Sequence, residues 1–340
     1  MPFDQEEEIL PKHNVCRVVA KDKFKRAPRN SRMQKRGFVR KLRGLLLLFF
    51  AFACYYVTTW TNYNSNTIAE ALSQFPNSRT FAYVMFVNSG YLHLTKNWIC
   101  NIRKLDAKIL TSVLFFTEHP KTTAELLSFD PGLKVFTGGH ESSGPLSFGT
   151  LPYFKLTMQR LEIQNALLQG LETNQRRCLM MIEADATWLI SDVDEELARL
   201  FEAFPLISAD NADHSEDQST REISAGFSGF CPTRDVKNLF AEYTSQYRTK
   251  LSRAKRSNPL LGEQLLLSQM IDATRTEVYW LDSCKYATGL WYISDEYRKK
   301  CPSPTVLQNN YIIGNDEKVK RAKENRHWFL HHSGKQCSTG

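Results

Sequence analysis

Three features are missing from this sequence of 340 residues, and each absence narrows the possibilities. The eight cysteines never occur at the short paired spacings that hold zinc, so a zinc-stabilised domain is not expected. No segment is repeated along the chain, which excludes a solenoid. No Asn-x-Ser/Thr sequon occurs, so glycosylation sites do not indicate on which side of a membrane the chain lies.

An excess of basic charge is missing outside the N-terminal tail. The formal net charge is +8, and residues 1–43 alone carry 13 Lys and Arg against 5 Asp and Glu. The other 297 residues carry 31 of each sign, and the overall composition, 42% hydrophobic and 24% charged, is that of a globular domain. A nucleic-acid binder with a basic tail at 21–43 is one alternative, but the neutral remainder argues against a nucleic-acid partner.

One long hydrophobic run follows the tail. Residues 44–60 are uncharged and would form a helix of roughly 25 Å, the short end for a membrane span. Basic residues flank only its N-terminal side, which predicts that this side faces the cytosol. A cleaved signal peptide would have an unusually long leader here, and a buried helix would show a polar face. The sequence predicts a single-pass type II membrane protein with a cytosolic tail (1–43), an anchor (44–60), a stem (61–78) and a lumenal domain (79–333).

The predicted lumenal domain alternates strands with helices. Strands separated by helices imply an α/β fold with a mostly parallel, Rossmann-type sheet flanked by helices. A loop with four glycines is long enough to be a lid over a ligand. The predicted strands are 81–87, 109–116, 133–136 and 178–182, the predicted helices follow residue 90 and cover 153–171, and the loop is 137–152.

Two carboxylates follow the fourth predicted strand. Glu183 and Asp185 are two positions apart, and strand alternation would place both on one side of the sheet. Open parallel sheets bind ligands at the carboxyl ends of their strands, where two oxygen ligands suit Mn²⁺ or Mg²⁺ with a diphosphate. The alternative is that Glu183 and Asp185 are solvated surface residues that bind no metal. The nearby Asp192 and Asp194 are expected in the first turn of a helix instead, capped by Ser191 or Asp192.

Six cysteines lie in the predicted lumenal part, where disulfides form. Six cysteines allow 15 pairings, and the sequence does not choose among them. They are Cys100, Cys178, Cys231, Cys284, Cys301 and Cys337.

Short blocks along the domain resemble, in their order, those of the nucleotide-diphospho-sugar transferase family related to glycosyltransferase family 77. The similarity runs from Arg79 to about Trp328, and the order of the blocks is more specific than any one of them. Plant members of this family attach arabinose, xylose or galactose to cell-wall glycans and glycoproteins. The blocks are Val87-Asn88-Ser89-Gly90-Tyr91, Tyr153-Phe154-Lys155, Glu183-Ala184-Asp185, Ser224-Ala225-Gly226-Phe227, Glu263-Gln264, and Asn310-Tyr311 followed by Gly314, Lys318 and Arg321.

The resemblance implies a GT-A-like fold and a function. It implies transfer of a sugar from a nucleotide-sugar to a glycan or glycoprotein acceptor, with retention of the anomeric configuration. The resemblance also implies that the donor is a UDP-sugar. It further implies a Mn²⁺ or Mg²⁺ cofactor and residence in the Golgi membrane, with the catalytic domain in the lumen.

The resemblance also implies a role for each matched position. Each role has an alternative. The basic residues Lys155, Arg160, Lys318 and Arg321 could lie on solvated helix faces, and Glu263 could be the acidic residue at the N-terminus of a helix. The implied metal ligands are Asp185, Glu183 and Gln308; the implied nucleotide-sugar contacts are Lys155, Arg160, Glu183, Gly226, Asn310, Gly314, Lys318 and Arg321; and the implied catalytic residues are Glu263 and Gln264.

One departure from the family pattern concerns the metal. Gln308 occupies the place of a histidine, and an amide is a poorer metal ligand than an imidazole. His331 or His332 could support the metal instead. The departure also favours an alternative function, that of a catalytically inactive family member which binds glycans or proteins in the lumen.

Overall fold

The structure is a computed structural model, and it describes residues 66–76, 79–138, 146, 148–173, 177–212, 221–254 and 262–338. The predicted tail at 1–43, the predicted anchor at 44–60 and half of the predicted lid at 137–152 lie outside these residues. Within the described ranges, no helix is both long and apolar enough to cross a membrane.

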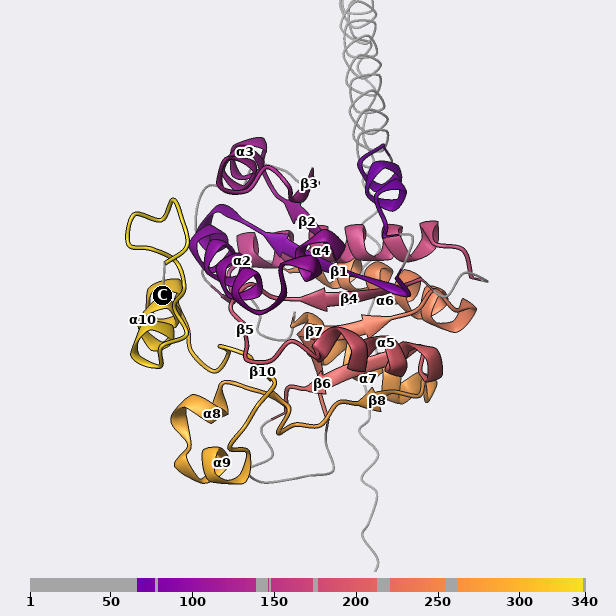
Figure 1. The fold of residues 1–340 in the computed structure, drawn as a ribbon. Helices are drawn as coiled ribbons and strands as arrows, with labels where there is room; N and C mark the ends of the chain where they lie inside the picture. Colours follow the sequence, from indigo (N-terminus) through magenta and orange to yellow (C-terminus); the bar gives the residue numbers. More distant parts are fainter. Residues whose placement is uncertain are drawn as a thin grey trace, which may run out of the picture. The chain divides into compact units, whose positions relative to one another are not determined.

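Strands and helices alternate along the described chain, as the sequence predicts (Figure 1). The strands are β1 (Phe81–Val87), β2 (Val113–Thr117), β3 (Lys134–Thr137), β4 (Cys178–Ile182), β5 (Thr187–Trp188), β6 (Leu206–Asp210), β7 (Ile223–Phe230), β8 (Tyr279–Trp280), β9 (Tyr286–Ala287) and β10 (Val306–Leu307). The helices are η1 (Ser89–Tyr91), α2 (Leu92–Asp106), η2 (Ala107–Ser112), α3 (Pro120–Phe129), α4 (Leu151–Gly170), α5 (Val193–Ala203), α6 (Arg234–Arg253), α7 (Glu263–Thr274), α8 (Leu290–Ile293), α9 (Asp295–Lys300) and α10 (Asn315–Glu324).

The second predicted strand is the main local error. The sequence predicts a strand at 109–116, but η2 covers Ala107–Ser112 and β2 begins only at Val113. The Asp106 side chain accepts a hydrogen bond from the Lys108 backbone N–H, which caps a 3₁₀ turn. This local hydrogen bond overrides the strand propensity of the apolar residues that follow.

The main sheet has the strand order β3-β2-β1-β4-β7-β6-β8. β1 pairs in parallel with β2 and β4, β2 with β3, and β6 with β8. β7 runs antiparallel to both of its neighbours, β4 and β6. The prediction of a mostly parallel sheet is therefore confirmed, and β7 makes the sheet mixed.

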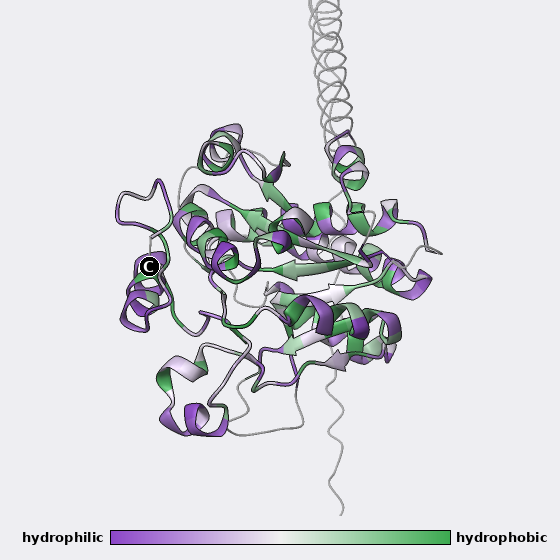
Figure 2. Ribbon diagram, in the orientation of Figure 1, coloured by the Kyte–Doolittle hydropathy of each residue, from purple (hydrophilic) through white to green (hydrophobic). Residues whose placement is uncertain are grey.

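The central strand β1 is buried on both faces. Phe81, Tyr83 and Met85 pack in one apolar cluster with residues of α2 and α5, whereas Ala82 and Val84 pack in a second cluster with residues of α4, α6 and α7. Figure 2 shows the strands in green between helices whose outer faces are purple. Helices therefore cover both faces of the sheet, as a Rossmann-type arrangement requires.

Part of the predicted stem packs into the domain. Residues 66–73 are helical, and Ala71 and Phe75 are buried in the second apolar cluster. Ile68, Ala71, Leu72 and Phe75 recur at the i, i+3, i+4, i+7 spacing of an amphipathic helix, which is why this polar-looking segment can dock.

Three disulfides resolve the pairing that the sequence leaves open. They join Cys100 to Cys337, Cys178 to Cys231, and Cys284 to Cys301.

Candidate active site

A second, small sheet brings the C-terminal part of the chain to the end of β4. Its order is β5-β10-β9, with β10 antiparallel to β5 and parallel to β9. β5 begins two residues after Asp185, and β10 ends one residue before Gln308. The pairing of β5 with β10 therefore places the residues after 307 beside the carboxylates that follow β4.

The two carboxylates after β4 have different partners. β4 ends before Glu183, and the Ala186 backbone N–H donates to the Glu183 carbonyl oxygen at 3.3 Å, so both carboxylates lie in a turn. Glu183 accepts from Arg160 at 3.2 Å, and Asp185 accepts from Lys318 at 2.5 Å. β4 ends at Ile182, so strand alternation no longer fixes where the two side chains point, and their position on one side of the sheet stays a prediction.

Lys318 and Asp185 form a desolvated ion pair. Only 10% of the Lys318 side chain and 3% of the Asp185 side chain are exposed. Lys318 also donates to the Tyr91 hydroxyl at 3.1 Å. Burial works against the charge of Lys318, but the Asp185 carboxylate outweighs it and raises the pKa of the lysine. Burial, reinforced by Asp185, likewise raises the pKa of Tyr91.

Arg160 reaches the site from α4. Its guanidinium pairs with Glu183 and lies 5.5 Å from the centre of the Phe86 ring. The Glu183 side chain packs on Gly226 of β7, where an added Cβ would lie 2.8 Å from the carboxylate oxygen Oε2. Gly226 is therefore needed for close approach, as expected of a small residue beside a ligand site.

Glu263 and Gln264 begin α7 and face the same part of β7. Gln264 accepts a hydrogen bond from the Ala225 backbone N–H at 2.8 Å. Glu263 is only 8% exposed. Burial raises the pKa of Glu263, Arg160 lowers it, and Glu183 adds to the rise. Glu263 is thus both the first acidic residue of a helix and a buried carboxyl near the cation Arg160.

Gln308 and Arg321 keep hydrogen-bond donors without a partner. The Gln308 side-chain oxygen accepts from the Ser224 hydroxyl at 3.0 Å, while its nitrogen has no partner. Arg321 donates to the Asn309 side-chain oxygen at 2.6 Å and to the Asn310 carbonyl oxygen at 2.5 Å, and its third nitrogen, Nη1, has none. Both side chains can therefore still donate a hydrogen bond to a ligand oxygen.

The remaining nucleotide-sugar candidates divide into two groups. Asn310 donates to the Asn211 side chain at 2.7 Å, and Gly314 has a φ of 100° immediately before α10, a conformation that favours glycine. Lys155 is exposed and has no hydrogen bond or ion pair with the other candidates. It lies five residues before Arg160 on α4, which turns it to another face of the helix.

The residues at the site fit a divalent cation only in part. The described residues hold no group of three or more His, Cys, Asp or Glu side chains that could bind a metal ion. The predicted ligand Gln308 fits poorly, because its oxygen already accepts one hydrogen bond from Ser224 and its nitrogen is a donor. The ring centres of His331 and His332 lie 3.8 Å apart with the rings tilted by 46°, and His331 also contacts Ser333. Asp185 and Glu183 alone can hold Mn²⁺ or Mg²⁺ when a diphosphate supplies the other oxygens.

Asp192 and Asp194 belong to a helix start, as predicted. Asp192 is the N-cap position of α5 and Asp194 lies in its first turn. Asp194 pairs with Arg79 and accepts from the Tyr83 hydroxyl at 3.1 Å. The literal Asp-x-Asp motif therefore supports packing.

Sequence patterns missed one aromatic side chain of the site. The Arg321 guanidinium lies 4.7 Å from the centre of the Tyr292 ring, and the Tyr292 hydroxyl contacts His327 at 2.8 Å. Tyr292 belongs to the four-residue helix α8, which no periodicity could have marked.

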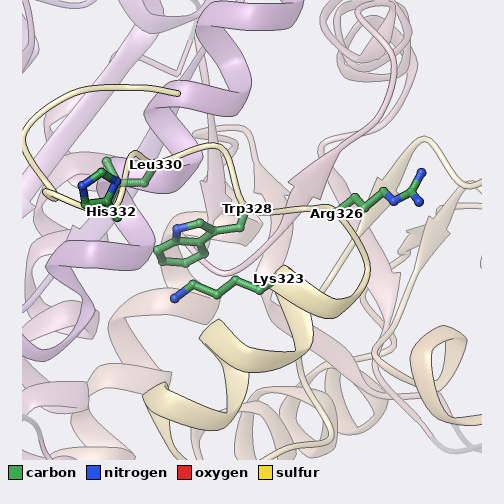
Figure 3. A pocket seen from close by; sticks show the side chains of 5 residues that line it. All are labelled: Lys323, Arg326, Trp328, Leu330 and His332. Atoms are coloured by element: carbon green, nitrogen blue, oxygen red, sulfur yellow. The ribbon is translucent and has the colours of Figure 1, made fainter. Parts of the chain in front are cut away.

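A separate hollow lies beside the C-terminal end of α10 (Figure 3). It has a volume of about 290 Å³, and of the residues considered for the site it includes only His332, the alternative support for the metal. Its lining residues are Lys323, Arg326, Trp328, Leu330 and His332.

An α/β domain that gathers carboxylates and buried cations at the carboxyl end of a central strand has the features of a glycosyltransferase that uses a nucleotide-sugar. Residues 108–322 match the nucleotide-diphospho-sugar transferase family, and the chain belongs to this family. The resemblance seen in the sequence is thereby confirmed, and the chain is a glycosyltransferase by membership.

Curated relatives include two xylosyltransferases of Arabidopsis thaliana. The UDP-D-xylose:L-fucose alpha-1,3-D-xylosyltransferase MGP4 is 24% identical over 260 residues, covering 73% of this chain and 69% of the relative. Another UDP-D-xylose:L-fucose alpha-1,3-D-xylosyltransferase is 25% identical over 286 residues, covering 80% of this chain and 74% of the relative.

Two solved structures show a weaker likeness. The crystal structure of mouse xyloside xylosyltransferase 1 in its apo form has a TM-score of 0.44 and 11% identity, covering 68% of this chain and 98% of that one. The glycosyltransferase GlyE of Streptococcus pneumoniae has a TM-score of 0.41 and 10% identity, covering 76% and 65%.

Proposed function

We propose that this protein transfers xylose from UDP-xylose to a hydroxyl group of a glycan or glycoprotein. The observation that carries the proposal is the set of cations at the carboxylates after β4: Arg160 and Lys318 pair with them, and Arg321 is close enough to interact with the charge of Asp185. The names of the relatives support UDP-xylose as the donor, and they make L-fucose the first acceptor to test.

The cations suit a leaving diphosphate. Negative charge grows on the diphosphate as its bond to the sugar breaks, and cations held away from water stabilise such charge more than solvated ones do. Lys318 is compensated by Asp185 until the donor binds. Arg321 Nη1 and Gln308 Nε2 have no hydrogen-bond partner, so their N–H groups are left to donate to a phosphate or sugar oxygen.

We further propose that the anomeric configuration is retained. A diphosphate oxygen would then take the proton of the acceptor hydroxyl on the face from which the diphosphate leaves. Glu263, whose pKa burial raises, would hold a hydrogen bond to the sugar, with Gln264 beside it.

For the cofactor, we propose Mn²⁺ or Mg²⁺. Asp185 and Glu183 would hold it together with the diphosphate, since the chain itself offers only these two fitting ligands in its described part. When bound, the cation would neutralise charge on the leaving group.

For the location, we propose the Golgi membrane, with a type II orientation and the domain in the lumen. The uncharged run at 44–60 with its basic N-terminal flank supports the anchor, and three disulfides suit an oxidising compartment. In sealed microsomes, a C-terminal epitope should resist added protease until detergent is present, whereas an N-terminal epitope should be digested without it. The reverse pattern would overturn this topology.

The activity is tested by UDP release from the full-length protein. UDP-xylose, UDP-galactose, UDP-arabinose and UDP-glucose would each be offered with methyl α-L-fucoside, with and without Mn²⁺. We expect release from UDP-xylose with Mn²⁺, and a loss of about a hundredfold or more in Asp185→Asn. Asp192→Asn is the matched control, because Asp192 is exposed and contacts Ser191. Absence of UDP release from all four donors would refute the catalytic proposal.

A further inference from the structure

The segment 311–314, part of the connection from β10 to α10 in Figure 1, exposes apolar side chains beside the active site. Ile313 is 78% exposed and Tyr311 is 38% exposed. Single exposed apolar residues are common, but this segment lies within an uncharged run, 308–315, that also contains site residues. Two neighbouring apolar side chains at the edge of a site indicate a surface that packs against something.

Tyr311 is held at the surface in a strained conformation. Its φ is 54°, in the left-handed region that aromatic residues rarely adopt. The Tyr311 hydroxyl donates to the Asn211 carbonyl oxygen at 2.6 Å, which fixes the ring. Such strain persists where the surroundings impose it, and it is concentrated at functional sites.

Both ends of the segment are tied to the donor side of the molecule. Before it, Asn310 donates to the Asn211 side chain at 2.7 Å. After it, Asn315 donates to the Gly90 carbonyl oxygen at 2.7 Å. Asn315 also precedes Lys318 by three residues, which places the two on neighbouring positions of one face of α10. The segment is therefore a rigid rim next to the lysine that pairs with Asp185.

The chemistry of the run suits a neutral sugar. An aromatic ring and an isoleucine can pack against the apolar C–H face of a sugar ring, while amides bond to its hydroxyls. The run contains no lysine, arginine, aspartate or glutamate that would favour a charged sugar. Resting on the proposed function, we infer that segment 311–314 is the platform on which a neutral sugar of the acceptor packs, with Tyr311 and Ile313 as its contact residues.

The test is glycoside binding to the full-length protein by saturation-transfer NMR, with and without UDP. The probes are methyl α-L-fucoside, methyl β-D-galactoside and methyl β-D-glucuronide. Wild type should bind at least one neutral glycoside about tenfold more tightly than the glucuronide. Tyr311→Asn, in which asparagine tolerates positive φ, and Ile313→Ser should each weaken that binding by about tenfold.

Two further variants isolate the platform. Tyr311→Phe should keep neutral-glycoside binding, since it keeps the ring and removes only the hydroxyl. Ile293→Ser should change nothing, because Ile293 is a similarly exposed isoleucine, at 62%, at the end of α8.

The outcomes separate this inference from the proposed function. Equal binding of neutral and charged glycosides, no neutral binding at all, or unchanged binding in Tyr311→Asn would each overturn the platform. Absence of UDP binding by the wild type would instead count against the proposed donor, and glycoside binding without UDP would still test the platform.

Discussion

Replacing Lys318 with methionine removes one charge of the buried ion pair and keeps most of the side-chain length. The Asp185 carboxylate, whose side chain is 3% exposed, then loses a partner 2.5 Å away. Breaking such a pair from one side costs about 3–5 kcal/mol, because the other charge stays buried. For a folded unit of this size, about 2–4 °C in Tm accompanies each kcal/mol, so Tm should fall by roughly 10 °C.

Circular dichroism of the full-length protein during heating measures this effect. Since the pKa of Lys318 is raised, the stability it contributes is fully present below the ordinary lysine value and is lost only as the pH rises through the raised one. The difference in Tm should therefore be constant between about pH 6 and pH 9. Lys320→Met is the matched control, because Lys320 is an exposed lysine on the same helix.

The double variant Asp185→Asn/Lys318→Met completes the argument. Removing both charges leaves no uncompensated ion, so its loss of stability should be well below the sum of the two single losses. Additive losses, or a fall of less than about 2 °C in Lys318→Met, would show that the pair contributes nothing to the fold.

Three further perturbations follow from the site and the core. Gly226→Ala should destabilise the protein by about 1–3 kcal/mol and weaken UDP binding, because the added Cβ would press on Glu183. Thermal unfolding with and without UDP measures both effects, and an unchanged response to UDP would contradict this reasoning. Burial raises the pKa of Glu263, so the stability that comes from its protonated form is lost as the pH rises. Glu263→Gln should therefore have a higher Tm than the wild type at pH 8, and this difference in Tm should close on acidification. A difference that stays constant with pH would exclude this cause. Replacing Cys178 and Cys231 by alanine should cost about 4 kcal/mol in denaturant unfolding, since they close a loop of 53 residues, and a loss below about 1 kcal/mol would argue against the disulfide.

Some of the features predicted from the sequence have a local pattern behind them, and others depend on the resemblance to the family alone. The strand at 178–182 and the acids that follow it were predictable, because an apolar run followed by acids is a local pattern, whereas the turn that holds Glu183 and Asp185 was not. The cationic partners Arg160 and Lys318 were suggested only by resemblance, since a charged helix looks the same whether its face is solvated or buried. Lys155 shows the converse, because its motif matches and yet its side chain is exposed.

Gln308 shows what sequence comparison alone leaves open. Its position suggested a weak metal ligand in place of histidine. The structure engages its oxygen with Ser224, a residue 84 positions away, and so changes which atom is left to act. No spacing rule foresees this contact, because it depends on how β7 and β10 meet.

The sequence by itself determined the local features of this protein: the alternation of strands and helices and the acids after β4. These depend on periodicity and on neighbours within a few residues. Only the tertiary structure decided that Lys318 meets Asp185 across 133 positions, and which cysteines pair. The physical reason is that the short strands β5 and β10 pair, which closes a long loop and buries the two charges together.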